Sequence, residues 1–420
     1  MSRMIDLTAV RPHFPALSQL QGDRPVVFFD NPGGTQCPQV VIDAVSHYLA
    51  WDNANHGGAF ATSLRSDAML AEAHQAMADL LGAASPSEIA FGANMTTLTF
   101  NVSRALGRTL SPGDEIIVTH LDHDANVAPW LLLAEDRGAV IRWVDIHAED
   151  CTLDLDSLSR QLSTRTKIVA VGYASNSVGT VNDVQRVVQM AHHVNAITFI
   201  DAVHYAPHGP IDVRALGCDL LACSAYKFFG PHVGAVYGRL DLLEQLAAYK
   251  VRPAGDRPPD KFETGTQNHE GIAGTLAAID YLASLASDQP AQASRRRRIL
   301  AAMAGIEWHE RGLCARLLEG LAGVPGLRVW GIADAARLHE RVPTVSFTID
   351  GIRPREIAER LARTGIFASS GHFYAVALTR RLGLDPAGGL LRIGLAPYNT
   401  IEEVDRLIGE VHAITRPLHG

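Results

Sequence analysis

The stretch Ser224-Ala225-Tyr226-Lys227-Phe228-Phe229-Gly230-Pro231 holds a single lysine among small, aromatic and glycine residues. It follows the apolar run Asp219-Leu220-Leu221-Ala222-Cys223, which predicts a buried strand. A lysine at the end of such a strand is costly to bury as an ammonium ion, but it is tolerated as a neutral imine. Lys227 is therefore a candidate Schiff-base lysine. The alternative is a lysine whose stem is buried and whose head reaches water.

A second apolar run, Ala196-Ile197-Thr198-Phe199-Ile200-Asp201, ends in an acid. The carboxyl end of a buried strand is where α/β sheets bind ligands. A pyridoxal phosphate (PLP) ring needs such a carboxylate, because the carboxylate keeps the pyridine nitrogen protonated and the ring then accepts electrons from the substrate. Lys227 and Asp201 together therefore predict a PLP site.

The stretch Glu88-Ile89-Ala90-Phe91-Gly92-Ala93-Asn94-Met95-Thr96-Thr97 predicts a strand, a tight turn and a helix N-terminus. Backbone amides and a hydroxyl at such a terminus form an anion site without any lysine. The alternative is an ordinary capped helix, because Asn and Thr are good caps. The stretch by itself leaves both interpretations open.

Strand-like apolar runs alternate with helical stretches through the first part of the chain. The runs are 26–30, 88–92, 115–118, 140–144, 167–171, 196–201, 219–223 and 233–238. Helices are expected at about 38–51 and 66–81. This alternation predicts a mainly parallel sheet with both faces covered.

We expect an N-terminal arm at 1–25, a large domain at 26–268 and a smaller domain at 269–420. The proline-rich loop 252–259 is a natural break before the character of the chain changes. The C-terminal part is expected to contain helices at about 272–285 and 295–321, strands at 327–330, 344–348 and 390–394, and a last helix that starts after Thr400.

The chain has 420 residues, of which 47% are hydrophobic and 20% charged, with a net charge of −8. This composition is ordinary for a globular protein of two domains. We expect no nucleic-acid partner, because the balance is acidic, and no membrane partner, because no apolar run reaches spanning length. The four arginines at 295–298 are the basic exception, interpreted as a solvated helix start or else an interface patch.

Five cysteines are scattered along the chain: Cys37, Cys151, Cys218, Cys223 and Cys314. No pair has metal-ligand spacing, so no metal site is expected, and the odd count argues against a disulfide framework. The first residues lack the pattern of a secretory signal. A cytoplasmic location is therefore the expectation.

These motifs together resemble the class V aminotransferases, the fold type I group of PLP enzymes that includes the cysteine desulfurases. The resemblance covers nearly the whole chain, and the motifs occur in the family order. It implies an α/β fold with a large domain, whose mainly parallel seven-stranded sheet lies between helices, and a smaller C-terminal α/β domain. It also implies PLP as cofactor, a small α-amino acid as substrate and a homodimer.

The resemblance assigns roles around the cofactor ring. Lys227 corresponds to the lysine that binds the cofactor and then moves protons at the substrate Cα. Asp201 corresponds to the partner of the pyridine nitrogen, and His123 to the imidazole that stacks on the ring. Asn176 corresponds to a residue between the ring hydroxyl and the substrate carboxylate, and His204 replaces the family glutamine near that hydroxyl.

The phosphate site is assigned in the same way. Met95, through its amide, and Thr96 and Ser224 correspond to the phosphate-binding residues of the family. Tyr226 replaces the histidine that the desulfurases usually carry before the lysine, and its phenol can still donate to phosphate. Thr266 corresponds to a hydroxyl that reaches the site of the other subunit.

Arg392 corresponds to the guanidinium that holds the substrate α-carboxylate. The loop Ser370-Gly371-His372-Phe373-Tyr374-Ala375 departs from the family, because Tyr374 stands where the sulfur-accepting cysteine is expected. A tyrosine cannot carry a persulfide, which needs a thiolate. His372 and Tyr374 are candidates to protonate a leaving group or to shape the substrate pocket, and the alternative is simple loop packing.

The function expected from these residues is a PLP-dependent C–S lyase, similar to a cysteine desulfurase but without a persulfide cysteine. Alternatives on the same scaffold are an aminotransferase, an epimerase or a decarboxylase, because the pocket decides which Cα bond breaks. An alternative of another class is a non-catalytic partner protein that retains the fold. Lys227, Asp201 and Arg392 argue against that last alternative.

Overall fold

The computed structural model describes residues 7–286, 289–290 and 292–415. Its main sheet has seven strands in the order β4-β12-β11-β10-β9-β5-β6, and only β12 runs antiparallel to its neighbours. The strands are β4 (Ile89–Gly92), β5 (Glu115–Thr119), β6 (Val140–Val144), β9 (Thr166–Gly172), β10 (Ile197–Asp201), β11 (Leu220–Ser224) and β12 (Gly234–Gly238). The expected mainly parallel seven-stranded sheet is confirmed.

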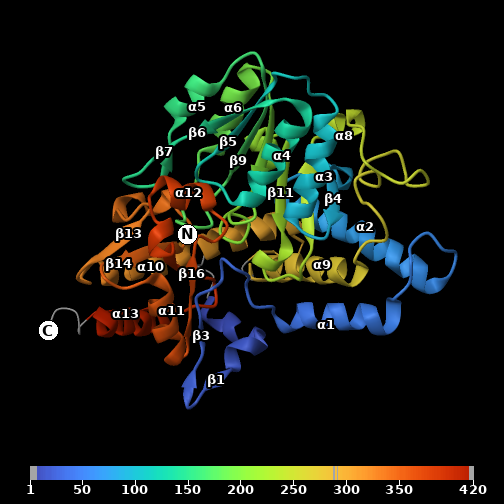
Figure 1. Ribbon diagram of the computed structural model, residues 1–420. Coiled ribbons are helices and arrows are strands. Elements are labelled where there is room, and N and C mark those ends of the chain that lie inside the picture. The colour runs from blue at the N-terminus through green and yellow to red at the C-terminus, as the bar shows by residue number, and fades with distance from the viewer. Residues whose placement is uncertain (1–6, 287–288, 291, 416–420) are drawn as a thin grey trace.

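Helices pack on this sheet and on one another (Figure 1). Those of the first part of the chain are α1 (Gln39–His47), α2 (Ala61–Leu81), α3 (Met95–Gly107), α4 (Ala128–Arg137), α5 (Leu155–Gln161), α6 (Val184–His193), α7 (Val213–Leu216) and α8 (Leu240–Gln245). The central strands β9, β10 and β11 are apolar along nearly their whole length, since both faces of the sheet are covered.

The C-terminal part has a separate four-stranded antiparallel sheet in the order β13-β14-β17-β16. Its strands are β13 (Leu327–Trp330), β14 (Thr344–Ile349), β16 (Ser369–Gly371) and β17 (Leu390–Gly394). Its helices are α10 (Arg295–Ala322), α11 (Pro354–Arg363), α12 (Val376–Arg381) and α13 (Ile401–Thr415). Residues of α10, α11, α13 and this sheet form their own hydrophobic core.

The short elements complete the chain. They are η1 (Leu7–His13), η2 (Pro15–Ser18), β1 (Leu20–Gln21), β2 (Arg24–Pro25), β3 (Val27–Phe28), η3 (Tyr48–Asp52), η4 (Pro86–Glu88), η5 (Asp124–Asn126), β7 (Ile146–His147), β8 (Thr152–Leu153), η6 (Ala225–Lys227), η7 (Ala335–Glu340), β15 (Ile366–Phe367) and η8 (Asp385–Ala387). Among the helices of the described residues, none combines the length and the apolar character that a membrane crossing requires.

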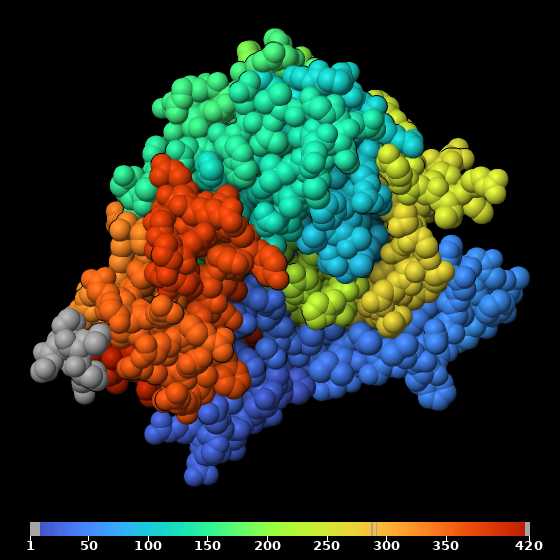
Figure 2. Space-filling view, in the orientation of Figure 1, coloured from blue at the N-terminus to red at the C-terminus, as the bar shows by residue number. Residues whose placement is uncertain are grey.

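Two segments pack differently from the domain division expected from the sequence. The strand expected at 26–30 is only β3, and it pairs in parallel with β15 of the C-terminal part, where Val27 and Phe29 join the second core. Helix α9 (His269–Ser284), the first helix of the expected small domain, contacts α1, α2 and α10 and contributes Ile272 and Ile279 to the core of the large part. Figure 2 shows blue N-terminal residues between the orange C-terminal part and the lime and yellow residues of the large part.

The arginine run at 295–298 is only partly the solvated helix start expected from the sequence, since Arg297 is exposed but Arg295 and Arg296 are not. The side chain of Arg295 is only 16% exposed and lies between Glu72, Asp79 and Asp280. Arg296 donates to the carbonyl oxygens of α2 and of the segment before α7. These charges therefore join the start of α10 to α2 and α9 inside the molecule.

Candidate active site

The carboxyl ends of adjacent strands bring the expected site residues to one edge of the main sheet. Asp201 ends β10 and aligns with Ala222 of β11 and with Gly172 of β9. Lys227 comes three residues after β11, and His123 follows β5. Parallel strands place their carboxyl ends together, so residues far apart in sequence meet here.

The N-terminus of α3 lies at one end of this site. Asn94 caps the helix by accepting a hydrogen bond from the amide of Thr97 at 2.9 Å. The amide of Met95 donates to Oγ of Ser224 at 3.0 Å, which ties the helix start to the end of β11. Thr96 lies beside them on the surface of the cavity. Amides and hydroxyls at a helix N-terminus suit a phosphate group.

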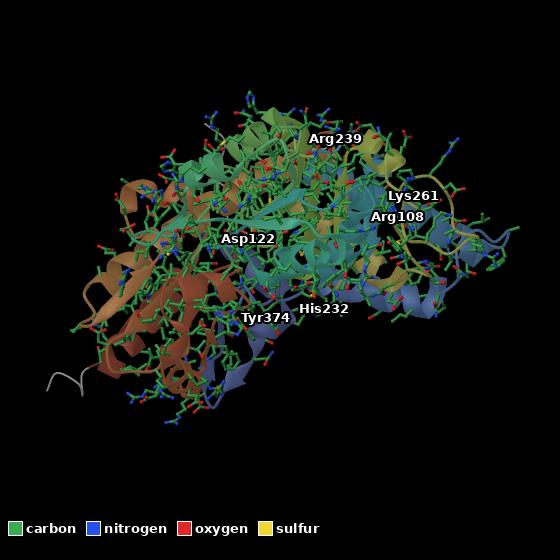
Figure 3. All side chains as sticks on the ribbon, turned by 45° about the horizontal axis from the view of Figure 1, so that its top comes forward. Arg108, Asp122, His232, Arg239, Lys261 and Tyr374 are labelled. Atoms are coloured by element: carbon green, nitrogen blue, oxygen red, sulfur yellow. The ribbon has the colours of Figure 1, made fainter. Side chains whose placement is uncertain are left out.

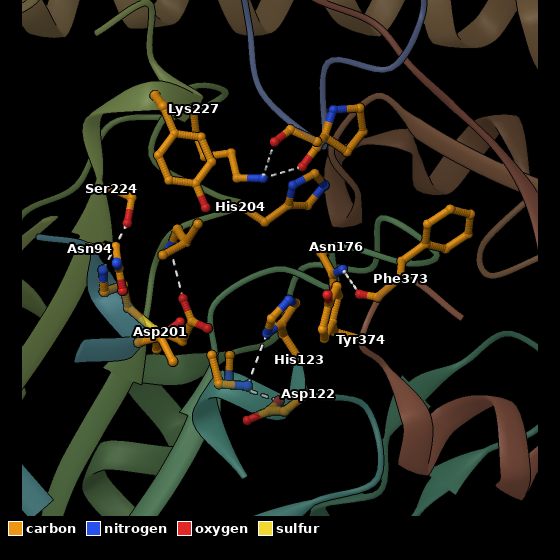
Figure 4. A pocket seen from close by; sticks show the side chains of 18 of the residues that line it. Asn94, Asp122, His123, Asn176, Asp201, His204, Ser224, Lys227, Phe373 and Tyr374 are labelled. Carbon is orange, nitrogen blue, oxygen red and sulfur yellow. Dashed lines mark hydrogen bonds between the residues drawn. The ribbon is translucent and has the colours of Figure 1, made fainter. Parts of the chain in front are cut away.

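The amine of Lys227 is held by backbone oxygens of the glycine-containing loop that follows β3. Nζ donates to the carbonyl oxygen of Pro32 and, at 3.0 Å, to that of Gly33 (Figure 4). Burial and the nearby Arg392 guanidinium lower the pKa of Lys227 to about 7. A lysine with such a pKa has a large neutral fraction at neutral pH, which suits it to attack a carbonyl.

Two buried acids, Asp201 and Asp122, also line the cavity. Oδ1 of Asp201 accepts a hydrogen bond from the amide of Val203 at 2.9 Å, and burial raises the pKa of this carboxyl to about 6. Asp122 accepts from the amide of Gly172 and the hydroxyl of Thr119, and burial raises its pKa to about 7. A cationic partner would favour the ionised form of Asp201, as a protonated pyridine nitrogen does.

His123 and Tyr374 both line the cavity and contact each other. Their rings stack with centroids 5.4 Å apart and planes inclined by 24°. Burial, Lys227 and Arg392 lower the pKa of His123 to about 4, so the imidazole is neutral. The amide of Asp124 donates to the carbonyl oxygen of Tyr374 at 2.8 Å, which joins the loop after β16 to the large part.

Arg392 projects from β17 and is 5% exposed. Its Nη1 donates to the carbonyl oxygen of Asn176 at 2.9 Å, its Nη2 lies 3.6 Å from Asp30, and its guanidinium covers the ring of Phe373. The side-chain Nδ2 of Asn176 donates to the carbonyl oxygen of Phe373 at 2.8 Å. Burial lowers the pKa of Arg392 to about 10, and the side chain still keeps its charge at neutral pH.

One cavity of about 720 Å³ is lined by all but one of the residues proposed from the sequence. Those lining it are Met95, Thr96, His123, Asn176, Asp201, His204, Ser224, Tyr226, Lys227, His372, Tyr374 and Arg392. Thr266 is exposed and lies outside this cavity. Figure 3 shows Tyr374 and His232, both cavity residues, where the orange-red C-terminal ribbon meets the large part.

The residues of the cavity fit pyridoxal phosphate. In the part of the chain that the structure describes, Oδ1 of Asn176 and Nε of Arg392 are buried without a hydrogen-bond partner. Buried polar atoms are normally paired, so these two indicate a bound polar ligand. The lysine amine, the buried acid and the helix N-terminus are donors and acceptors for an aldehyde, a pyridine nitrogen and a phosphate, respectively.

Several cavity residues could not have been found from the sequence. Asp30 comes close to Arg392 because β3 belongs to the C-terminal core. The glycines of the loop 31–35 favour a close approach of its backbone, but its partner could not be read from the sequence: the carbonyl oxygens of Pro32 and Gly33 accept hydrogen bonds from Lys227. Phe373 adopts a left-handed backbone with φ of 51°, which is unusual for an aromatic residue.

Comparison with known proteins identifies the family of the chain. The family model of the class-V aminotransferases matches residues 27–407. A probable cysteine desulfurase of Mycolicibacterium paratuberculosis is 34% identical over 98% of this chain, which spans 58% of that relative's length. The aminotransferase-like protein FGM3 of Gibberella zeae is also 34% identical, over 97% of this chain and 98% of its own.

A solved structure extends the likeness to three dimensions. The apo structure of cysteine desulfurase from Thermococcus onnurineus NA1 matches with a TM-score of 0.86 and 27% identity, over 99% of both chains. The fold and the site therefore define a PLP-dependent enzyme of fold type I. The chain belongs to the class-V aminotransferase family and is similar to cysteine desulfurases.

Proposed function

We propose that the protein is a C–S lyase that eliminates the sulfur substituent from the Cβ atom of a small α-amino acid. The observation that carries the proposal is the cavity in which Lys227, Asp201 and Arg392 meet beside the loop 370–375, here called the rim loop, which bears Tyr374 and no thiol. The cysteine desulfurases among its relatives support the substrate class. The cofactor supplies an electron sink that acidifies the substrate Cα–H bond when it is bound.

Arg392 binds the α-carboxylate of the substrate in this proposal. Its guanidinium is fixed by the carbonyl oxygen of Asn176 and by the ring of Phe373, so its remaining donors point in a set direction. A guanidinium can hold a carboxylate through two parallel hydrogen bonds. This fixes the substrate on the side of the cavity formed by β17 and orients its Cα–H bond.

Lys227 carries the proton that leaves Cα. Its lowered pKa, about 7, leaves a large fraction of its amine neutral and able to accept a proton near neutral pH. Lys227 keeps this proton, the electron pair of the Cα–H bond forms the Cα–Cβ double bond, and the Cβ–S bond breaks as the sulfur takes a proton from Tyr374 or His372. The product 2-aminoacrylate reacts with water to give pyruvate and ammonium.

The rim loop determines where the sulfur goes. Cys151, Cys218, Cys223 and Cys314 are buried, and burial raises the pKa of the partly buried Cys37. None of the five cysteines lines the cavity. A persulfide on the enzyme needs an accessible thiolate, so the sulfur leaves as free thiol or sulfide. Tyr374 and His372 are the groups proposed to protonate it.

The experiment is a product assay with L-cysteine and S-substituted cysteines. Equal amounts of pyruvate, ammonium and released sulfur compound are expected, without transfer of the amino group to an added keto acid. Exchange with keto acids in the absence of pyruvate release would instead indicate an aminotransferase, an alternative that the aminotransferase-like relative from Gibberella zeae favours. Racemisation or CO₂ release alone would indicate an epimerase or a decarboxylase.

A homodimer is part of the proposal. Large apolar side chains are exposed in and between α1 and α2, namely Val40, Ile42, Leu49, Trp51, Phe60 and Leu64. Exposed large apolar side chains are often covered by a second subunit. Glu263 is anchored by the amide of Phe91 and by His74, and residues 264–266 after it are exposed. We propose that, in a dimer through this face, the exposed Thr266 reaches the cavity of the partner.

Two further expectations remain proposals. The domain division at residues 25 and 268 agrees with the separate C-terminal core, apart from the packing of β3 and α9. A cytoplasmic location is supported by the five free cysteines, because unpaired thiols are typical of a reducing compartment.

A further inference from the structure

His204 is a buried cavity residue whose ring contacts both parts of the molecule. It follows β10, is 4% exposed and lines the cavity. Its Nε2 lies 2.9 Å from Oγ1 of Thr344, the first residue of β14. Because Nε2 is taken by Thr344, Nδ1 is the ring nitrogen that remains for the cavity.

The surroundings of His204 hold its ring neutral. It is faced by Lys227, Arg392, His123 and His208, and burial together with these groups lowers the pKa of His204 well below its usual value. His208 meets the ring edge to face, with centroids 5.5 Å apart, and its Nδ1 lies 2.8 Å from Oε2 of the buried Glu310. A neutral imidazole has a single N–H, carried either by Nε2 or by Nδ1.

Thr344 decides between these two forms. Its side chain has no solvent exposure, and within the described residues Nε2 of His204 is the hydrogen-bond partner of its hydroxyl. If the hydroxyl accepted a hydrogen bond from Nε2–H, its own proton would be buried without an acceptor. A buried unpaired donor costs more free energy than an unused lone pair on an acceptor. The hydroxyl therefore donates to Nε2, and the proton of the ring lies on Nδ1.

We propose that Thr344 is a positioning residue that fixes His204 as the Nδ1–H tautomer, which donates a hydrogen bond to the phenolic oxygen of pyridoxal phosphate. That oxygen is bonded to the ring carbon next to the one that carries the aldehyde, the group for which Lys227 is the partner. The inference rests on the placement of His204 beside the ring hydroxyl. Through His204, it gives a strand of the C-terminal sheet an influence on the cofactor's charge.

The test is a spectroscopic pH titration of the holoenzyme, because a donor to the phenolic oxygen stabilises its anionic form. In Thr344→Val the side chain keeps its shape but loses the hydroxyl. The midpoint of the pH-dependent visible absorption change should rise by about one pH unit, the worth of one hydrogen bond to a charged group. Thr344→Ser restores the hydroxyl and should return the midpoint to the wild-type value.

The same Thr344→Val substitution in a His204→Gln protein separates the tautomer effect on the midpoint from a general disturbance of β14. In His204→Gln the side-chain amide donates without any choice of tautomer, so adding Thr344→Val should leave the midpoint unchanged. An equal shift in both backgrounds, or no shift in the single variant, would overturn the proposal. The titration needs only bound cofactor, so its outcome is independent of whether the enzyme proves to be a lyase.

A measurement on the unaltered protein covers the case in which Thr344→Val does not bind cofactor. Nitrogen-15 NMR of histidine-labelled wild-type apoprotein reports the protonated ring nitrogen, and the signal of His204 is assigned by its loss in His204→Gln. The account expects a protonated Nδ1 and an unprotonated Nε2. The reverse pattern would exclude the role of Thr344.

Discussion

The pKa of the Lys227 amine is set by opposing effects of its neighbours, and a pH titration can test the result. Burial and the charge of Arg392 lower the pKa of Lys227 to about 7, while Asp30 and Asp201 act in the opposite direction. Only the neutral amine attacks the cofactor aldehyde. The rate at which apoprotein captures pyridoxal phosphate should therefore rise as the pH approaches 7 and become level above about 8, near the pKa of the amine.

Stopped-flow absorbance between pH 5.5 and pH 10 measures this rate. Replacement Arg392→Gln removes a positive neighbour and should move the midpoint to higher pH, whereas Arg392→Lys keeps the charge and should move it less. A rate that keeps climbing to pH 10, as an ordinary lysine would give, contradicts the lowered pKa.

The role of the Tyr374 hydroxyl can be tested separately from the role of its ring. Tyr374→Phe keeps the ring that stacks on His123 and removes only the hydroxyl. If the phenol protonates the leaving sulfur, kcat should fall about 100-fold with little change in KM, as expected for the loss of a general acid. Steady-state kinetics of sulfide release measures this, and wild-type kcat in Tyr374→Phe would leave packing as the role of Tyr374.

At the scale of single residues, the sequence predicted the groups whose chemistry is unusual in a core. Lys227 and Asp201 were recognised because a charged side chain at the end of a buried apolar strand is costly unless it has a partner or a function. Thr344, Asp30 and Phe373 were not, because each becomes important only through a contact across more than 100 residues. A buried threonine at the start of a strand has no feature in sequence that distinguishes it from any other.

Among the elements, the N-terminus of α3 is the proposed phosphate site. Thr96 lines the cavity, whereas its neighbour Thr97 does not. Thr96→Val should weaken the affinity for pyridoxal phosphate about tenfold, which corresponds to one hydrogen bond to a charged group. Equilibrium titration of apoprotein measures this affinity. Thr97→Val is the matched control, and a similar loss in both variants would argue against a phosphate contact by Thr96.

The elements of the main sheet were predictable because apolar runs of strand length alternate with helices. The ends of the helices beside it differ only modestly from the expected ones: α2, for example, begins at Ala61 rather than at residue 66. The pairing of β3 with β15 was not predictable, since a two-residue strand carries almost no periodic signal. The burial of Arg295 was missed for a similar reason, because its three acidic partners come from α2 and α9.

At the scale of the whole molecule, the exposed apolar side chains around η3 predict self-association. Trp51 is 69% exposed, and Trp308 of α10 is comparably exposed at 57% but lies outside this group. Trp51→Glu should convert a dimer to a monomer, because a charge cannot be buried unpaired in an interface. Light scattering during size-exclusion chromatography measures the mass. Trp308→Glu should remain dimeric, and dimers of Trp51→Glu would refute this interface.

The central claim is that Lys227 is the residue that holds the cofactor in the cavity between the two parts of the molecule. The most direct measurement is borohydride reduction of the holoenzyme, followed by proteolysis and mass spectrometry. The account predicts a pyridoxyl group on Nζ of Lys227 and on no other lysine. Absence of a reduced adduct, or its presence on a different lysine, would contradict the account.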